Sequence, residues 1–291
     1  MSGQNLTRAE AQARAAHVRV QSYDVDLDLT SDGPTFTSTS TVRFTSSDPS
    51  QQCWLDLLAP SVTSIQLNGS PVDPSTAYDG ARVQLTGIAE QNEVTVTAQC
   101  AYMSTGEGMH RFVDPVDKET YLYTQFEVPD SRRVFAVFEQ PDLKAPFTFT
   151  VDAPDGWLVV SNTTAEVTST SSGAQRWAFS PTAPLSSYVT AICAGPYHVA
   201  RSEYVGEHGT VPLAVYCRQS LAEHLDADEI FDITRRGFAF FEDLFDYPYP
   251  FGAYDQLFVP EFNAGAMENA GCITYRDEYL FRSRVTDAAY E

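Results

Sequence analysis

The sequence predicts a mainly β N-terminal domain, built of antiparallel sheets in a sandwich or saddle, followed by the start of a second domain that mixes helix and strand. Three observations lead to this prediction. Apolar and polar residues alternate through many short runs, which is the period of a half-buried strand. Clusters of turn-forming residues separate these runs. After Gly195-Pro196 the alternation gives way to helical spacing.

The first 200 residues carry one expected helix and a series of expected strands. Ala-rich spacing, with Asn5 or Thr7 as the N-cap, predicts a helix over residues 6–16. The clearest strands are expected at 23–29, 41–44, 93–97, 147–151 and 187–192. The turns between the runs are expected at 31–34, 68–69, 79–80, 155–156 and 171–173. Regular alternation divided in this way favours paired strands over unrelated loops.

Residues 201–291 are expected to begin the second domain, because the pattern changes near residue 200. A strand at 211–216 precedes a helix at 226–245, and a further strand follows at 256–260. The helix carries an apolar stripe on one face, made of Ile230, Ile233, Phe238, Phe241 and Phe245. Two prolines within residues 247–250 end the helix, since proline has no N–H to donate.

Composition narrows the possible functions. The chain has 291 residues, of which 43% are hydrophobic, enough for two domains with packed cores. Its net charge of −21 repels phosphate backbones and anionic lipids, so neither a nucleic-acid nor a membrane partner is expected. No apolar run reaches the roughly 20 residues of a membrane helix, and the N-terminus lacks the apolar core of a secretory signal.

The cysteines indicate a cytoplasmic location. Five of them are scattered along the chain without a CxxC pair, which is typical of reduced thiols. A disulfide framework and a cysteine-ligated zinc site are therefore not expected. The sequons at Asn5, Asn68 and Asn162 are interpreted as chance matches, because no secretory signal accompanies them.

A first candidate site lies in residues 262–271, where small residues surround one carboxylate and one amide. Ala264, Gly265 and Ala266 allow a backbone or a ligand to approach closely, and Glu268 and Asn269 supply the polar groups. The pattern alone favours a sheet edge or turn that carries a solvated glutamate.

A second candidate site lies in residues 123–130. Gln125 and Glu127 are two residues apart and fall on one face of an extended segment. Pro129 stops regular pairing directly after them, so the pair is expected at a strand end, facing a cleft. The alternative is a surface strand with a polar outer face. Arg132 and Arg133 follow and are expected to neutralise nearby carboxylates.

The five histidines give no metal or catalytic motif. None begins an HExxH, and no two of them have the spacing of ligands on one helix. His224 is interpreted as an exposed residue at the start of a helix. P-loop, Rossmann and Ser-His-Asp patterns are also missing from the sequence. The residues by themselves therefore define an acidic two-domain protein without an assigned reaction.

The two candidate segments carry a resemblance to a known family. Gly265-Ala266-Met267-Glu268-Asn269 resembles the GAMEN signature of the aminopeptidase N family of zinc metallopeptidases. Residues 123–127, with 132–135 and 139–145, look like that family's other substrate-anchoring segment, and the run 246–251 is similar as well. The overall pattern is similar to that of actinobacterial members. The resemblance implies a β-rich domain docked on a thermolysin-like catalytic domain.

The resemblance also implies roles for the candidate residues. Glu268, and Glu127 with Gln125, would bind the protonated α-amine of a peptide, while the backbone of Gly265 and Ala266 pairs with the extended substrate. The remaining members of the implied substrate-binding set are Ala264, at the first subsite, Met267 and Asn269. An ammonium about 4 Å from a carboxylate gains roughly 4 kcal/mol at an effective dielectric near 20. Two converging carboxylates therefore discriminate against blocked or internal peptides.

The chain departs from the family at the metal site. Relatives carry HExxH after GAMEN, whereas this sequence reaches Glu291 without it. We therefore expect a fragment that holds amine-binding residues but no catalytic residue and no metal ligand. One zinc ion per chain is expected in the full-length aminopeptidase, which would release N-terminal amino acids from peptides, and none in this piece. The alternatives are an epoxide-hydrolase-type relative and a non-catalytic β-sandwich interaction module, and the sequence that follows residue 291 would discriminate among them.

Overall fold

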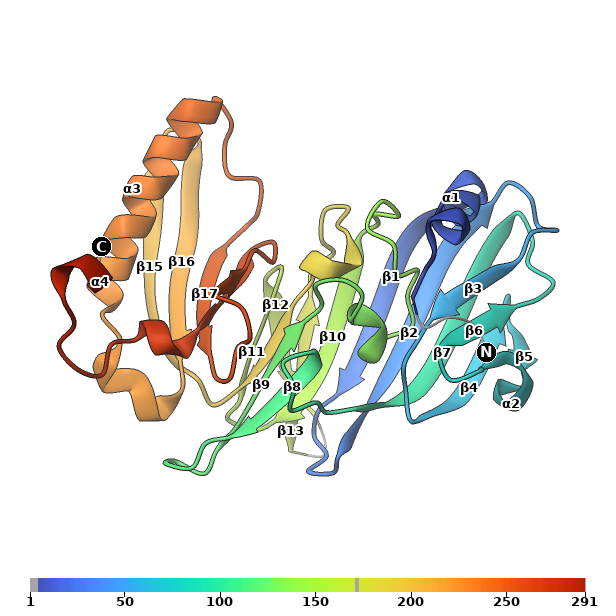
Figure 1. Ribbon diagram of the computed structural model, residues 1–291, viewed down its shortest axis with the longest axis horizontal. Helices are drawn as coiled ribbons and strands as arrows, with labels where there is room; N and C mark the ends of the chain where they lie inside the picture. The colour runs from blue at the N-terminus through green and yellow to red at the C-terminus, as the bar shows by residue number, and fades with distance from the viewer. Residues whose placement is uncertain (1–4, 171–172, 291) are drawn as a thin grey trace.

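The computed structural model describes residues 5–170 and 173–290, and it is mainly β (Figure 1). An eight-stranded sheet occupies one end of the molecule, a four-stranded sheet lies in the middle, and a five-stranded sheet with a long helix forms the other end. The predicted fold class is confirmed. The turn expected at 171–173 falls partly outside the described residues.

The eight-stranded sheet forms because its strands alternate buried and exposed side chains. In β2, every second residue from Phe36 to Ser46 is buried. The sheet is antiparallel except where β1 and β10 run parallel. In sheet order its strands are β12 (Ala165–Ser169), β13 (Ala174–Phe179), β10 (Phe147–Pro154), β1 (Val18–Asp28), β2 (Thr35–Ser46), β7 (Gln91–Ala101), β4 (Ser61–Leu67) and β5 (Ser70–Val72).

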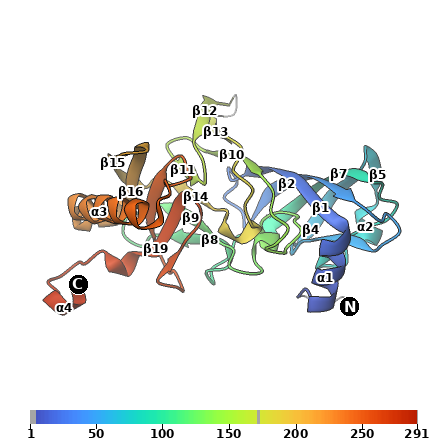
Figure 2. The same ribbon diagram turned by 90° about the horizontal axis from the view of Figure 1, so that it is seen from above.

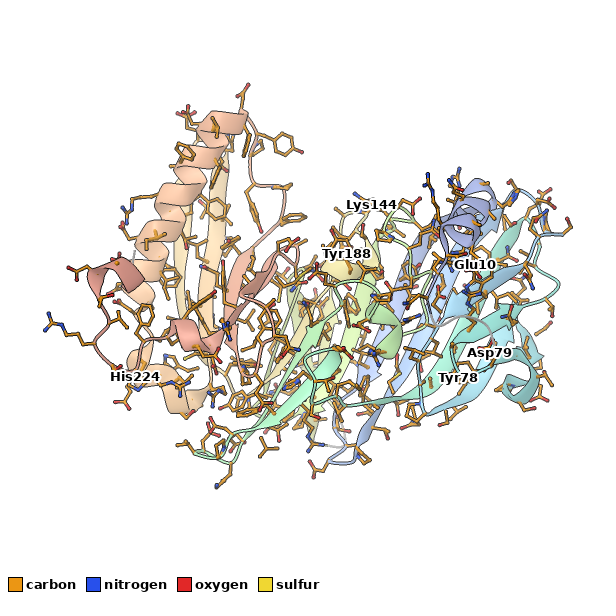
Figure 3. All side chains as sticks on the ribbon, in the orientation of Figure 1. Glu10, Tyr78, Asp79, Lys144, Tyr188 and His224 are labelled. Atoms are coloured by element: carbon orange, nitrogen blue, oxygen red, sulfur yellow. The ribbon has the colours of Figure 1, made fainter. Side chains whose placement is uncertain are left out.

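Two short helices and a strand pair complete this end of the molecule. The predicted N-terminal helix is α1 (Arg8–His17), which begins with a capping box between Thr7 and Glu10. Figure 3 labels Glu10 on this helix. The other elements are α2 (Pro74–Ala77) and the pair β3 (Cys53–Asp56) and β6 (Arg82–Leu85).

The middle sheet consists of β11 (Leu158–Ser161), β14 (Ile192–Gly195), β9 (Thr120–Gln125) and β8 (Gly108–Val113). The strand expected at 187–192 is wrong over most of its length, because residues Ser187–Val189 form a 3-10 turn. The Ser187 hydroxyl donates to Glu139, and the Thr190 hydroxyl donates to the Ser187 carbonyl. The Thr190 bond is a local bond from a side chain to the backbone, which Thr often makes in place of ladder pairing, whereas the Ser187 bond reaches a distant side chain.

The five-stranded sheet contains β15 (His198–Gly206), β16 (Gly209–Cys217), β17 (Tyr254–Val259), β19 (Cys272–Arg276) and β18 (Ala266–Met267). The predicted long helix is α3 (Ala227–Phe245), which connects the parallel strands β16 and β17 and lies along one face of the sheet (Figures 1 and 2). His224 ends a 3-10 helix and is half-buried, so its expected exposure is wrong. The last helix is α4 (Asp287–Tyr290).

A shared apolar cluster joins the middle and five-stranded sheets. Tyr121 and Tyr123 of β9 pack in it with Met267 of β18 and Cys272 of β19. Tyr188, labelled near the centre of Figure 3, packs both against this cluster and against the core under the eight-stranded sheet. The two candidate segments are therefore brought to one junction by a continuous core.

Candidate functional site

The first candidate segment forms the outer edge of the five-stranded sheet. Strand β18 pairs with β19 in the register Ala266 to Tyr275, and the Arg276 N–H donates to the Gly265 carbonyl at 3.1 Å. Backbone groups alternate in direction along an antiparallel strand, so the N–H and C=O of Ala266 point away from β19. This residue offers one free donor and one free acceptor to a further extended chain.

Side chains in this segment alternate between the surface and the core. Ala266 and Glu268 are exposed, whereas Met267 is buried in the shared apolar cluster and Ala264 is half-buried against it. Asn269 is also buried, and its Nδ2 lies 3.4 Å from the Thr274 hydroxyl. Of the predicted set, Glu268 is the polar side chain that the segment presents to solvent.

Gly265 lies close to the end of the Tyr279 side chain. A Cβ at this position would lie 2.8 Å from the Tyr279 hydroxyl oxygen. A larger residue would therefore move the half-exposed Tyr279 ring, which belongs to the 3-10 helix Asp277–Tyr279.

The second candidate segment divides where β9 ends. Gln125 is the last residue of the strand, and Glu127 lies in the turn beyond it, where the Asp130 N–H donates to the Phe126 carbonyl. The expectation that both side chains share one extended segment is therefore wrong. Glu127 is exposed, whereas the Gln125 Oε1 is buried and has no hydrogen-bond partner among the described residues. An unpaired buried oxygen is costly, so a donor from a water molecule or a bound group would stabilise it.

The basic residues after this turn are used elsewhere. Arg133 pairs with Asp130 at 2.5 Å and with Glu107 at 3.1 Å, and Arg132 is buried with a 3.1 Å hydrogen bond to the Asn5 side chain. Within the described residues, neither Glu127 nor Glu268 has an ion-pair partner. The expected neutralisation thus applies to Asp130 and Glu107, and both candidate carboxylates remain open to a cationic ligand.

Contacts that the sequence did not suggest bring the two segments together. The Tyr123 hydroxyl of β9 donates to the Glu261 carbonyl at 3.3 Å, and its ring meets the Phe262 ring at a centroid distance of 5.6 Å. His110 of β8 stacks on Tyr123 and lies 3.1 Å from the Glu261 carboxylate. His110 and Glu261 are 151 positions apart, so no local pattern signals their pairing.

The described residues do not fit a metal ion. In residues 5–170 and 173–290, no group of three His, Cys, Asp or Glu side chains lies close enough together to hold one.

No helix in the described ranges is long and apolar enough to cross a membrane. The site presents the exposed carboxylate of Glu268 beside the outward-facing backbone of Ala266.

The fold and this edge-strand site define a class of protein. The Peptidase M1 N-terminal domain model matches residues 19–189, and the Peptidase family M1 domain model matches residues 229–290. The chain therefore belongs to peptidase family M1, a family of metallopeptidases, and the predicted membership is confirmed.

The relatives that the chain matches are aminopeptidases by name. It is 56% identical over 294 residues to Aminopeptidase N of Streptomyces lividans, covering 100% of this chain and 34% of that protein. It is 33% identical to Aminopeptidase Ey of Gallus gallus, covering 54% and 16%, and 34% identical to Aminopeptidase 2, mitochondrial, of Saccharomyces cerevisiae, covering 67% and 19%. The chain thus spans about a third or less of the length of these relatives.

Proposed function

We propose that this chain is the substrate-anchoring part of a metallo-aminopeptidase that releases N-terminal amino acids from peptides. The observation that carries the proposal is the open backbone edge at Ala266 beside the exposed, unpaired carboxylate of Glu268. The edge provides one donor and one acceptor for a peptide in extended form. The negative carboxylate of Glu268 would pair with the terminal ammonium of that peptide.

The second anchor is the end of β9. The buried Gln125 Oε1 lacks a donor among the described residues, and Glu127 is exposed in the turn that follows. A protonated amine has three N–H donors, so it can satisfy a carboxylate and an amide oxygen together. A peptide with a blocked terminus lacks these donors and the charge, which makes the free α-amine the recognised feature.

We propose that the hydrolytic step is carried out by the rest of the longer protein. We propose one zinc ion per chain of the longer protein, where it would activate a water molecule. The described residues do not fit the ion, so their contribution is to bind the amine and align the peptide. Ala264, half-buried beside the edge, would line the first subsite.

We also propose a cytoplasmic location and peptides, rather than nucleic acids or membranes, as the partners. All five cysteines are buried free thiols, which is typical of a reducing compartment. The net charge of −21 favours cationic ligands over phosphate-rich ones.

The test is to replace each candidate carboxylate by alanine in the longer protein that includes the zinc site. Glu268→Ala and Glu127→Ala should each lower kcat/KM by about 10- to 150-fold, the value of one charge-assisted hydrogen bond. Bound zinc should stay at one per chain, because neither residue is proposed as a ligand. Glu166→Ala, on the exposed face of β12, is the matched control and should retain full activity.

The double variant sharpens this test. Both carboxylates act on one amine, so Glu127→Ala combined with Glu268→Ala should lose less than the product of the two single effects. Wild-type activity in either single variant, on peptides with a free α-amine, would contradict the amine-binding role. A longer protein that retains no zinc and hydrolyses no aminoacyl amide would instead support the non-catalytic interaction module.

A further inference from the structure

We propose that His110 is a positioning residue that fixes the loop leading into Ala264–Glu268, by joining the Gly106 amide to the Glu261 carboxylate. This inference rests on the proposed function for its consequence in substrate binding. The contacts themselves are independent of that function.

The hydrogen bonds of His110 define its role. The side chain is fully buried, its Nδ1 accepts from the Gly106 N–H at 3.0 Å, and its Nε2 lies 3.1 Å from the Glu261 Oε2. Because Nδ1 accepts, the proton of the neutral ring is assigned to Nε2, which then donates to the carboxylate. The ring stacks on Tyr123 at a centroid distance of 4.9 Å, which holds its plane.

The same two loops meet at a second point. The Asn263 Nδ2 donates to the Thr105 carbonyl at 2.5 Å. A Cβ at Gly106 would lie 2.4 Å from that Asn263 nitrogen, so the contact depends on glycine, whose φ is +77°. The loop 103–108 and the loop 261–263 are therefore fitted to each other by backbone shape as well as by His110.

The backbone of Glu261 needs this support. Its φ is +53°, in the left-handed region that non-glycine residues rarely occupy and that surrounding contacts must hold. Two contacts act on it, one from His110 to the carboxylate and one from the Tyr123 hydroxyl to the carbonyl. Its side chain is otherwise 57% exposed, so solvent would replace the first contact if the histidine were removed.

The far end of the candidate segment is held separately. The Asn162 Nδ2 donates to the Ala270 carbonyl at 2.8 Å, and the Ala270 N–H donates to the Val189 carbonyl at 3.1 Å. The segment is thus attached at both ends to the β-rich part of the chain, with the open Ala266 edge between the attachments. If the His110 contacts were lost, the substrate would have to order that edge and Glu268 when it binds. The cost of this ordering weakens substrate binding and leaves the rate of the chemical step unchanged.

The first test measures amide hydrogen exchange in the longer protein. His110→Phe keeps a ring on Tyr123 but removes both hydrogen bonds, so the Gly106 and Arg276 amides should exchange about 10- to 100-fold faster. His110→Asn keeps an acceptor near the Nδ1 position and should protect Gly106 better than His110→Gln, which keeps a donor near the Nε2 position. His198→Gln, a half-buried histidine on β15, is the matched control and should leave both amides unchanged.

The second test uses kinetics in the longer protein. His110→Phe should raise KM about 10-fold while kcat stays within about 3-fold, and His110→Gln should restore part of the loss. A purely structural defect would instead lower the amount of active protein without changing KM. If the wild-type longer protein hydrolyses no peptide, the proposed function fails, but the exchange test still decides the role of His110.

A third test, at Glu261, applies if His110→Phe does not fold. Glu261→Gln changes an exposed side chain, removes the charge that His110 donates to, and should raise KM in the same direction but by a smaller factor. The positioning role is overturned if Glu261→Gln and every folded His110 variant retain wild-type exchange at Gly106 and Arg276 and wild-type KM.

Discussion

The two ends of the molecule use the same apolar residue types with opposite results. In the eight-stranded sheet, Val42 and Phe44 are fully buried, because the sheet's inner face is covered by the rest of its own domain. In α3, Phe231 is the buried residue, whereas Phe240 and Phe245 are 61% and 68% exposed. An amphipathic pattern therefore determines that a helix forms, but burial of its apolar face depends on a partner.

The uncovered face of α3 borders a depression of about 530 Å³. Its walls are the aromatic side of the helix, the Tyr247–Pro250 loop and the nearby strands, with Phe238, Phe241, Tyr249 and Tyr254 among the lining residues. The relatives are about three times as long as the matched region or longer. We expect the later part of the longer protein to pack there. In the 291-residue chain, the two ends should therefore differ in local stability.

The largest expected difference between the two ends is in their rate of cleavage by chymotrypsin. Both ends contain many aromatic cleavage sites, so a difference in rate reports local opening and not the number of sites. The first cuts should fall within residues 238–250, at least about 100-fold faster than any cut in the eight-stranded sheet, since cleavage follows local opening. A resistant product ending near Gly195–Glu207 should then accumulate. Unfolded chain, cut equally at both ends, is the control. Equal protection of the two ends in the native chain would show that α3 is as stable as the sheets.

Elements with regular periods could be predicted from the sequence. The alternation at 23–29 and 147–151 and the helical spacing at 226–245 correspond to β1, β10 and α3. The prediction failed at 187–192, where the Thr190 hydroxyl donates to the Ser187 carbonyl and a 3-10 turn takes the place of most of the alternating run.

The candidate site could be predicted only in part. Glu268 stood out because few polar groups surround it, and Gln125 because it lies two residues before Glu127 near a strand end; both segments also resemble a known family. His110 did not stand out, because its partner Glu261 is 151 positions away and a buried histidine has no characteristic neighbours in sequence. Such pairings depend on how the sheets dock, which local patterns do not encode.

A buried arginine adds an ionic link between the five-stranded sheet and the β-rich part of the chain. Arg218 follows β16 and contacts Asp114 of the β-rich part as well as Asp277, with Nη2 2.7 Å from the Asp277 carboxylate. Arg218→Ala would remove the nearest cation from two buried carboxylates, of which Asp277 would keep only Arg282 at 3.7 Å, and should cost about 3–5 kcal/mol in the free energy of unfolding. Urea denaturation followed by circular dichroism measures this loss.

A matched arginine tests whether burial is the cause. Arg236 on α3 pairs with Asp232 at 2.9 Å, but both side chains are exposed. Arg236→Ala should therefore change the free energy of unfolding by about 0.5 kcal/mol or less. If the Arg218 and Arg236 variants lose similar stability, the buried pairings do not hold the two ends together.

A change smaller than the Arg218→Ala loss, and of opposite sign, is expected at the five-stranded sheet. Burial raises the pKa of Asp255 to about 6, against the hydrogen bond from the Tyr216 hydroxyl and the charge of Arg201. The folded state thus binds this proton more tightly than the unfolded state, whose pKa is near 3.8, so the stabilising contribution is present below pH 3.8 and is lost as pH rises through 6. At pH 7, Asp255→Asn should raise the free energy of unfolding by an amount on the order of 1–3 kcal/mol, and the gain should shrink between pH 6 and 4. Asp243→Asn, at an exposed position on α3, is the control. Thermal unfolding across this pH range measures both variants, and a gain that does not depend on pH would show that ionisation of Asp255 is not its source.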